Sequence, residues 1–153
     1  MSERKLKYAI GIYLVMSHLV LIGLAIALYF ANGFSIDEFT TVLAIVAPMF
    51  AGYTTSILAF IIKEARVLSD ASPAVNRVYV LFSFLMPSIL VVVIAISFWL
   101  KAHNQVFGDF EDFKRFLLLM ESLFAGYAGM FIYSLFEKQA PVGATVKQGP
   151  DAG

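Results

Sequence analysis

The sequence predicts an all-α integral membrane protein whose four transmembrane helices form two parallel two-helix repeats, with both termini in the cytoplasm. Three observations predict this fold. Hydrophobic residues make up 60% of the 153 residues and charged residues only 14%, the mean hydropathy is +0.82, and four apolar runs each reach the ~20 residues that cross a ~30 Å hydrocarbon core. A water-soluble domain of this size cannot bury so large an apolar fraction, so much of the surface is expected to face lipid.

The four apolar runs define the expected spans: 8–30, 42–62, 78–100 and 116–136. The first follows a basic segment, but it is longer than the apolar core of about 7–15 residues found in cleavable signal peptides, so it is expected to be retained. Together the runs make residues 1–138 one transmembrane domain. Residues 139–153 combine Pro, Gly and scattered polar side chains, and they are expected to form a flexible C-terminal tail.

The distribution of basic residues predicts the orientation in the membrane, because Lys and Arg accumulate in cytoplasmic loops. Both termini and the middle loop, 63–77, are then cytoplasmic, while 31–41 and 101–115 face outward. Small size, compact loops and a short basic N-terminus lead us to expect a bacterial inner membrane. The cytoplasmic set is Arg4, Lys5, Lys7, Lys63, Arg66, Arg77, Lys138 and Lys147, and the opposite set is Lys101, Lys114 and Arg115.

Composition and motifs exclude several kinds of activity. Basic and acidic residues number 11 each, and this balance argues against nucleic acid as a partner. The chain has no cysteine, and therefore no disulfide, thiolate metal site or thiol nucleophile. Its two histidines, His18 in a span and His103 in an outer loop, do not suit a haem held within one subunit. No motif for hydrolysis or phosphoryl transfer is present, so we expect neither an enzyme nor a cofactor.

A short sequence recurs in the second and fourth apolar runs and indicates an internal repeat. Residues 50–53 and 124–127 both read Phe-Ala-Gly-Tyr, and the same offset aligns Ser35–Phe39 with Asp109–Phe113. Both upstream copies are typical of helix starts, with an N-cap Ser or Asp followed by acidic side chains that the helix dipole favours. Because each copy contains two spans, the copies are expected to insert in the same direction, related by an axis along the membrane normal.

Small and hydroxyl side chains around the repeated motif have two interpretations. As small-xxx-small pairs, they let helix backbones approach closely in lipid. Alternatively, Tyr53 and Tyr127 are equivalent hydroxyls that line a path or a ligand pocket, together with Thr54, Thr55 and Ser56. The second copy lacks this hydroxyl cluster, and its absence favours packing. The residues assigned to helix packing are Ala51, Gly52, Ala125, Gly126 and Gly129.

Two ionisable side chains other than tyrosine lie well inside the spans, His18 in the first and Glu121 in the fourth. Such residues are costly in lipid unless they face protein or water. His18 is either a proton-responsive or pore-lining residue or one half of a helix-to-helix hydrogen bond. Glu121 either coordinates a cation or gates a path, or it is a protonated acid bonded to a neighbouring span. The expected spans place His18 ~15 Å from the cytoplasmic end and Glu121 ~8 Å from the outer end.

Proline and phenylalanine positions add two further expectations. Pro48 and Pro87 lie inside the second and third runs, where each frees a backbone carbonyl and is expected to produce a static bend or a hinge. On the outer side, four phenylalanines recur every three residues, as suits an aromatic anchor at the interface or a docking surface. Phe34 and Phe39 also stand at the N′ and N4 positions of a hydrophobic staple. The four phenylalanines are Phe107, Phe110, Phe113 and Phe116.

Three functions fit these observations. The favoured one is a small homo-oligomeric ion channel or pore, with His18, Glu121 or the 54–56 hydroxyls facing the path. The second is a non-conducting accessory or scaffold subunit that packs against a larger membrane complex through its small-residue faces. The third is a carrier for a small solute. The lipid bilayer and either a homo-oligomer or a larger membrane complex are the expected partners.

The layout, with both tails inside, a basic middle loop over 63–77 and 153 residues in all, resembles that of the small four-span membrane proteins of phage exclusion systems. The resemblance covers the whole chain and rests on architecture, without a motif that can be carried across residue by residue. It implies a channel.

Overall fold

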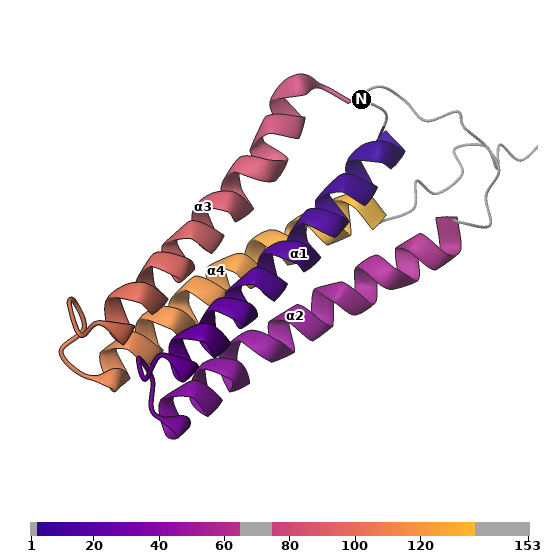
Figure 1. The fold of residues 1–153 in the computed structure, drawn as a ribbon. Coiled ribbons are helices and arrows are strands. Elements are labelled where there is room, and N and C mark those ends of the chain that lie inside the picture. Colours follow the sequence, from indigo (N-terminus) through magenta and orange to yellow (C-terminus); the bar gives the residue numbers. More distant parts are fainter. Residues whose placement is uncertain (1–2, 65–74, 137–153) are drawn as a thin grey trace, which may run out of the picture.

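A computed structural model describes residues 3–64 and 75–136, which form four α-helices (Figure 1). The helices are α1 (Glu3–Phe30), α2 (Ile36–Glu64), α3 (Arg77–Ala102) and α4 (Phe110–Phe136). Each expected apolar run lies within one helix, so the all-helical prediction is confirmed. The expected tail, 139–153, and most of the middle loop lie outside the described residues.

Three of the four helices are long and apolar enough to cross a membrane: Arg4–Phe30, Ile36–Ala59 and Arg77–Ala102. α4 is not among these three helices. It nevertheless packs along α2 and α3 as part of the same bundle. A membrane crossing by α4, like the orientation of the termini, stays a prediction.

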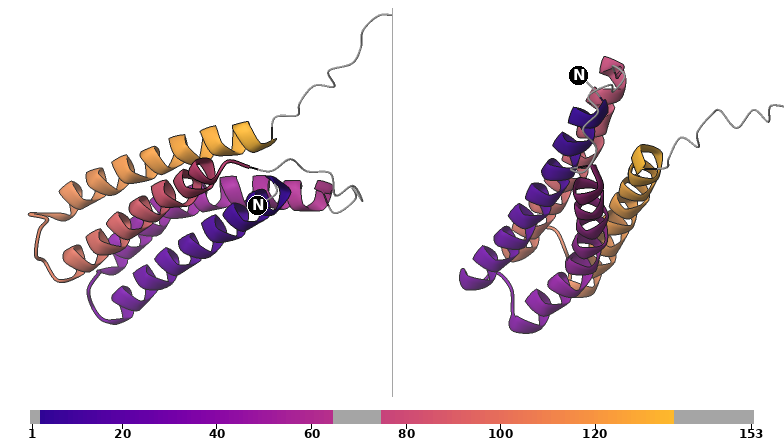
Figure 2. Two further views of the ribbon diagram at one scale, coloured as in Figure 1. Left: turned by 90° about the horizontal axis from the view of Figure 1, so that it is seen from above. Right: turned by 90° about the vertical axis from the view of Figure 1, so that its right-hand side faces the viewer.

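The helices form a bundle in which each has two principal neighbours. α1 packs against α2 and α3, and α4 packs against the same two, so the order around the bundle is α1, α2, α4, α3. Two short connections, 31–35 and 103–109, lie at one end (Figures 1 and 2), which we call the loop end; the opposite end carries Glu3 and Arg77, and we call it the N-terminal end. In Figure 1, α2 and α3 lie near each other at the loop end and separate toward the N-terminal end.

This neighbour order does not confirm the parallel repeat. A two-fold axis through the centre of a four-helix bundle places equivalent helices diagonally opposite each other. Here α1 and α3, the first helices of the two expected copies, are side by side, and so are α2 and α4. The two hairpins thus lie next to each other in the same direction, and the duplication itself stays a prediction.

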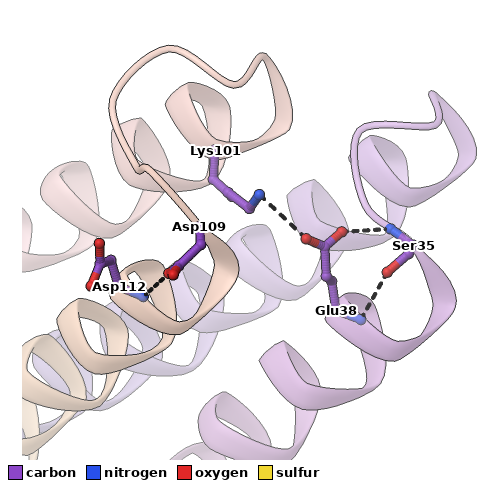
Figure 3. Close-up of polar contacts among 5 residues, drawn as sticks. All are labelled: Ser35, Glu38, Lys101, Asp109 and Asp112. Atoms are coloured by element: carbon purple, nitrogen blue, oxygen red, sulfur yellow. Dashed lines mark hydrogen bonds and ion pairs between the residues drawn. The ribbon is translucent and has the colours of Figure 1, made fainter.

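Polar side chains fix the helix starts at the loop end, as the sequence predicts. The Ser35 backbone N–H donates to Glu38 Oε2 at 2.8 Å, and the Glu38 N–H donates to Ser35 Oγ at 3.2 Å. This reciprocal pair is a capping box, which satisfies amides that have no partner within the helix. Asp109 caps α4 in a similar way, accepting from the Asp112 N–H at 2.8 Å (Figure 3).

Glu38 has a second role that the sequence analysis missed. Its Oε1 lies 3.3 Å from Lys101 Nζ in the last turn of α3 (Figure 3). The pair therefore ties α2 to α3, which are diagonal partners in the bundle. The Lys101 side chain is 10% exposed, so this bridge is largely shielded from solvent. The positive charge of Lys101, in the last turn of α3, also complements the negative end of the helix dipole.

Of the four phenylalanines expected to form an anchor, Phe113 is a core residue, and Phe107, Phe110 and Phe116 are half-buried. The ring of Phe113 is fully buried and packs against Phe34, Phe98 and Phe107, with ring centroids 5.2–6.0 Å apart. We call Phe34, Phe98, Phe107 and Phe113 the aromatic layer. The expected ladder fails because α4 begins only at Phe110, so Phe107 approaches from the loop. In the expected staple, Phe34 packs into this layer, while Phe39 stacks on Tyr29.

Candidate buried polar site

His18 lies in the interior of the bundle, fully buried, and aromatic rings from two other helices surround it. Its imidazole is 4.5 Å from the Phe124 ring of α4 and 4.8 Å from the Tyr53 ring of α2, both in edge-to-face geometry. Phe50 stacks on it at 6.3 Å. Both phenylalanines and Tyr53 belong to the repeated motif, so the two copies meet at this histidine.

Glu121 is also buried, with only 3% of its surface exposed, and it precedes Phe124 by about one turn of α4. Glu121 and Tyr53 are close enough to interact electrostatically, and the Tyr53 ring also packs against His18. At 1.5 Å per residue, Glu121 lies about 16 Å from the Phe110 end of α4 and His18 about 18 Å from the Phe30 end of α1. The two are at similar depths, unlike the expectation, because α4 starts at Phe110 and not at residue 116.

Six buried side-chain atoms in this region have no hydrogen-bond partner among the described residues. They are His18 Nδ1 and Nε2, Tyr53 OH, Thr54 Oγ1, and Glu121 Oε1 and Oε2. We call these four residues the central polar cluster. The Leu14 carbonyl interacts with His18 and also accepts the Ser17 hydroxyl at 3.0 Å.

These unpartnered atoms are energetically significant. A buried polar group without a hydrogen bond costs about 1–3 kcal/mol, and an ionised one costs more. Most polar groups in native interiors are paired, so each exception calls for an explanation. The exceptions come from three helices: His18 from α1, Tyr53 and Thr54 from α2, and Glu121 from α4.

Tyr127 has a different environment from its sequence counterpart, Tyr53. Its hydroxyl donates to the Ser83 carbonyl at 2.7 Å. In a regular helix that carbonyl accepts from the N–H four residues later, but Pro87 has none. Tyr127 of α4 therefore satisfies the carbonyl that Pro87 of α3 leaves without a helical partner. The expected repeat does not predict this contact.

The other residues singled out in the sequence lie mainly outside the cluster. The hydroxyls of Thr55 and Ser56 bond to carbonyls of their own helix, at 2.8 and 3.2 Å. α2 and α3 continue through Pro48, which is exposed, and Pro87, which is buried. Among the packing residues, Ala125 is half-buried, and the following lie on the outer surface of the bundle: Ala51, Gly52, Gly126 and Gly129. Helix packing through these surfaces stays a prediction that concerns contacts with another chain.

A polar contact closer to the N-terminal end escaped the sequence analysis. The Tyr13 hydroxyl of α1 lies 2.7 Å from Ser88 Oγ of α3, and Ser88 in turn donates to the Phe84 carbonyl at 2.6 Å. Tyr127 interacts electrostatically with the hydroxyls of Tyr13 and Tyr79. These tyrosines lie at different depths in three helices, and no sequence pattern indicates that they come together. Ser88, directly after Pro87, was recognisable as a polar position.

The chemistry of the central polar cluster suits proton binding. Imidazole, carboxyl and phenol groups can each accept or donate a proton, and imidazole does so near neutral pH. Within the described residues, no three His, Cys, Asp or Glu side chains are grouped so that they could hold a metal ion.

Comparison with known proteins gives no further guide, because no protein-family model, curated protein or solved structure matches this chain. The resemblance to the proteins of phage exclusion systems therefore stays an expectation.

Proposed function

We propose that this chain is a membrane protein that transfers protons through the interior of its own four-helix bundle, with His18 and Glu121 as proton carriers and Tyr53 between them. The observation that carries the proposal is the burial of three ionisable side chains, from three helices, with no hydrogen-bond partners among the described residues. Groups of this kind in a membrane interior are characteristic of proton relays.

Two features favour a proton over a larger ion. An alkali or alkaline-earth cation needs several oxygen ligands arranged around it, whereas the cluster offers one carboxyl, two hydroxyls and an imidazole. The aromatic rings of Phe50 and Phe124 also fill the space around His18. A proton needs only a chain of groups within hydrogen-bonding reach, which side-chain rotation or a water molecule can complete.

The burial of these groups also favours a path within each bundle over a path between subunits. A pore between subunits requires its polar side chains on the outer surface, but His18 and Glu121 face the interior. The proposal therefore retains the channel expected from the sequence but places its path inside each bundle instead of between subunits. Homo-oligomers can still form, but the path does not depend on them.

The test is proton flux in liposomes that contain the purified protein and a trapped pH-sensitive dye. A potassium gradient with valinomycin sets the membrane potential that drives protons. The wild type is expected to collapse an imposed pH gradient faster than protein-free liposomes, and Glu121→Gln and His18→Phe are expected to fall to the protein-free rate. Glutamine keeps the size of the acid, and phenylalanine suits the aromatic surroundings of His18.

Two neighbouring residues provide matched controls. Ser122→Ala alters an exposed side chain whose hydroxyl bonds to the Leu118 carbonyl of its own helix, and Ser17→Ala alters a similar self-bonded serine next to His18. Both are expected to keep the wild-type flux. A wild type no faster than protein-free liposomes over a range of pH and potential contradicts the proposal, and so does unchanged flux in both His18→Phe and Glu121→Gln.

A second candidate function, a non-conducting accessory subunit, is supported by the outward face of α2. Small side chains recur along that face about every fourth residue, and a Cβ added at Gly52 meets no atom within 4 Å. Such a face admits another helix at close range. Replacing Gly52 by Ile is then expected to abolish co-purification of a partner from native membranes, while Ile at the equally open Gly23 of α1 is expected to leave it intact. The small members of the α2 face are Ala44, Ala47, Ala51, Gly52, Thr55 and Ala59.

A further inference from the structure

Buried polar groups are distributed unevenly on the two sides of the central polar cluster. Toward the N-terminal end, hydroxyls from α1, α3 and α4 meet one another or a free carbonyl: Tyr13 with Ser88, and Tyr127 with the Ser83 carbonyl. We call Tyr13, Ser83, Ser88 and Tyr127 the hydroxyl relay.

Toward the loop end the interior is apolar. Leu21, Ala25, Val46, Ile94 and Leu117 form the layer next to the cluster, each at most 1% exposed. The aromatic layer lies beyond them. The one buried serine in this half of α3, among the described residues, is Ser97, and its hydroxyl bonds to the Ile94 carbonyl of its own helix at 2.7 Å.

The loop end is also closed by its connections. The bridge between Glu38 and Lys101 crosses it diagonally, and the first connection packs so tightly on the end of α3 that a Cβ added at Gly33 would lie 2.7 Å from the Ala102 Cβ. A water molecule or a proton would have to cross both apolar layers to reach the cluster from here, and neither layer offers it a free hydrogen-bonding group.

The N-terminal half also has an apolar core, which includes Leu6, Ile10 and Leu14, but the polar contacts of Tyr13, Ser88 and Tyr127 lie beside it. α2 and α3 separate toward the N-terminal end (Figure 1), and the first turns of α3 have little cover, with Val78 59% and Leu81 61% exposed. The tight apolar contact in this half lies between α1 and α2, where a Cβ added at Gly11 would meet Ile57 at 2.8 Å. The hydroxyl relay occupies the other side, between α1, α3 and α4.

We propose that water reaches the central polar cluster from the N-terminal end, along the hydroxyl relay of Tyr13, Ser83, Ser88 and Tyr127, and that the apolar layers at the loop end are the main barrier that a proton crosses on its way through the bundle. This inference deepens the proposed function and rests on it for its purpose, because a relay is useful only to a site that exchanges protons. The ligand of the relay is water, which can bridge successive hydroxyls and extend them to Tyr53.

The chain contains no cysteine, so single cysteines report access without background. Ser83 and Ser97 form a matched pair, since both are buried serines of α3 whose hydroxyls bond to their own helix. Ser83→Cys, Ser88→Cys and Ser97→Cys would be reconstituted in liposomes and exposed to a small cationic methanethiosulfonate, which requires water to reach a thiol. Intact mass measures labelling, and Lys5→Cys and Gln105→Cys, both at exposed positions, identify the side to which each bundle end faces.

The expected result is labelling of Ser83→Cys and Ser88→Cys from the side that labels Lys5→Cys, and no labelling of Ser97→Cys from either side. Labelling of Ser97→Cys from the Gln105 side overturns the inference, and so does failure of both relay cysteines to react while Lys5→Cys reacts. Because labelling needs no proton flux, one-sided labelling without flux would contradict the proposed function alone, and flux with labelling from the Gln105 side would contradict the entry route alone.

Discussion

Tyr127 donates a 2.7 Å hydrogen bond to the Ser83 carbonyl, the acceptor that Pro87 deprives of its helical partner. The contact joins α4 to α3 at a point where a bare carbonyl would otherwise face an apolar interior. It stabilises a bend-prone position in α3, which remains helical on both sides of the proline.

Tyr127→Phe is therefore expected to destabilise the bundle by about 1 kcal/mol, within the range for an unsatisfied buried polar group. In a Pro87→Ala background the new backbone N–H at this position restores the helical bond to the Ser83 carbonyl, so the same tyrosine substitution should cost much less. A double-mutant cycle by denaturant titration in detergent measures the coupling. Equal costs in both backgrounds would show that the tyrosine does not serve this carbonyl.

A second prediction separates the two contacts of Glu38. Glu38→Gln keeps a capping-box side chain but removes the charge opposite Lys101, whereas Glu38→Ala removes both. We expect a loss of about 1–3 kcal/mol for Gln, since a largely shielded lysine is left without its partner, and a greater loss for Ala. Adding Lys101→Met to Glu38→Gln should recover part of the stability, and a double variant less stable than Glu38→Gln would refute this account of the bridge.

The third prediction concerns glycines with opposite surroundings. Gly33→Ala places a methyl group 2.7 Å from the Ala102 Cβ and 3.1 Å from the Leu28 carbonyl, and overpacking of this kind costs about 1–3 kcal/mol. Gly126→Ala meets nothing within 4 Å and should stabilise α4 by up to about 1 kcal/mol through helix propensity. Thermal unfolding in detergent compares the two, and a Gly33→Ala protein as stable as Gly126→Ala would contradict the tight loop-end packing.

Glu121 provides a test that distinguishes a functional acid from a structural one. Glu121→Leu removes a buried carboxyl that has no partner among the described residues and replaces it with an apolar side chain of similar volume. The variant is expected to be more stable by about 1–3 kcal/mol and to lose proton transfer, since functional sites are often maintained at the expense of stability. Lower stability than the wild type would mean that the acid supports the fold.

Loss of the Tyr13 hydroxyl should slow proton transfer without abolishing the carriers. Tyr13→Phe breaks the 2.7 Å contact with Ser88, and we expect a reduction in flux of about tenfold, equivalent to ~1.4 kcal/mol on the barrier. Tyr29→Phe, at a ring that stacks on Phe39 near the loop end, is the matched control and should behave as wild type. Equal flux in both variants would exclude Tyr13 from the relay.

Local sequence signals predicted local structure well. Ser35 and Asp109 cap their helices as expected, because a cap depends on a few adjacent residues. The aromatic ladder expected from Phe107 was wrong because it depends on where α4 begins. The helix starts only at Phe110, so Phe107 lies outside it, and Phe113 packs into the core. Likewise, Pro87 predicts that the Ser83 carbonyl lacks a helical partner, but no local sequence signal indicates that Tyr127 bonds to it.

The candidate site was predictable in its members and not in its geometry. His18 and Glu121 stood out because ionisable residues are rare in apolar runs, and Tyr53 stood out through the repeated motif. Their meeting within one bundle depends on the neighbour order of the helices and on the six additional residues at the start of α4. Both are set by tertiary packing, which hydropathy and motif spacing do not encode.

The side-by-side placement of the two hairpins has a consequence for biosynthesis. α1 and α2 emerge from the ribosome first and bring His18 and Tyr53, while Glu121 arrives with the second hairpin. Ring contacts between His18 and Phe124 then join halves that are made at different times. A half-translated chain therefore holds His18 and Tyr53 but not Glu121, so the proposed proton path is complete only after the last helix has docked.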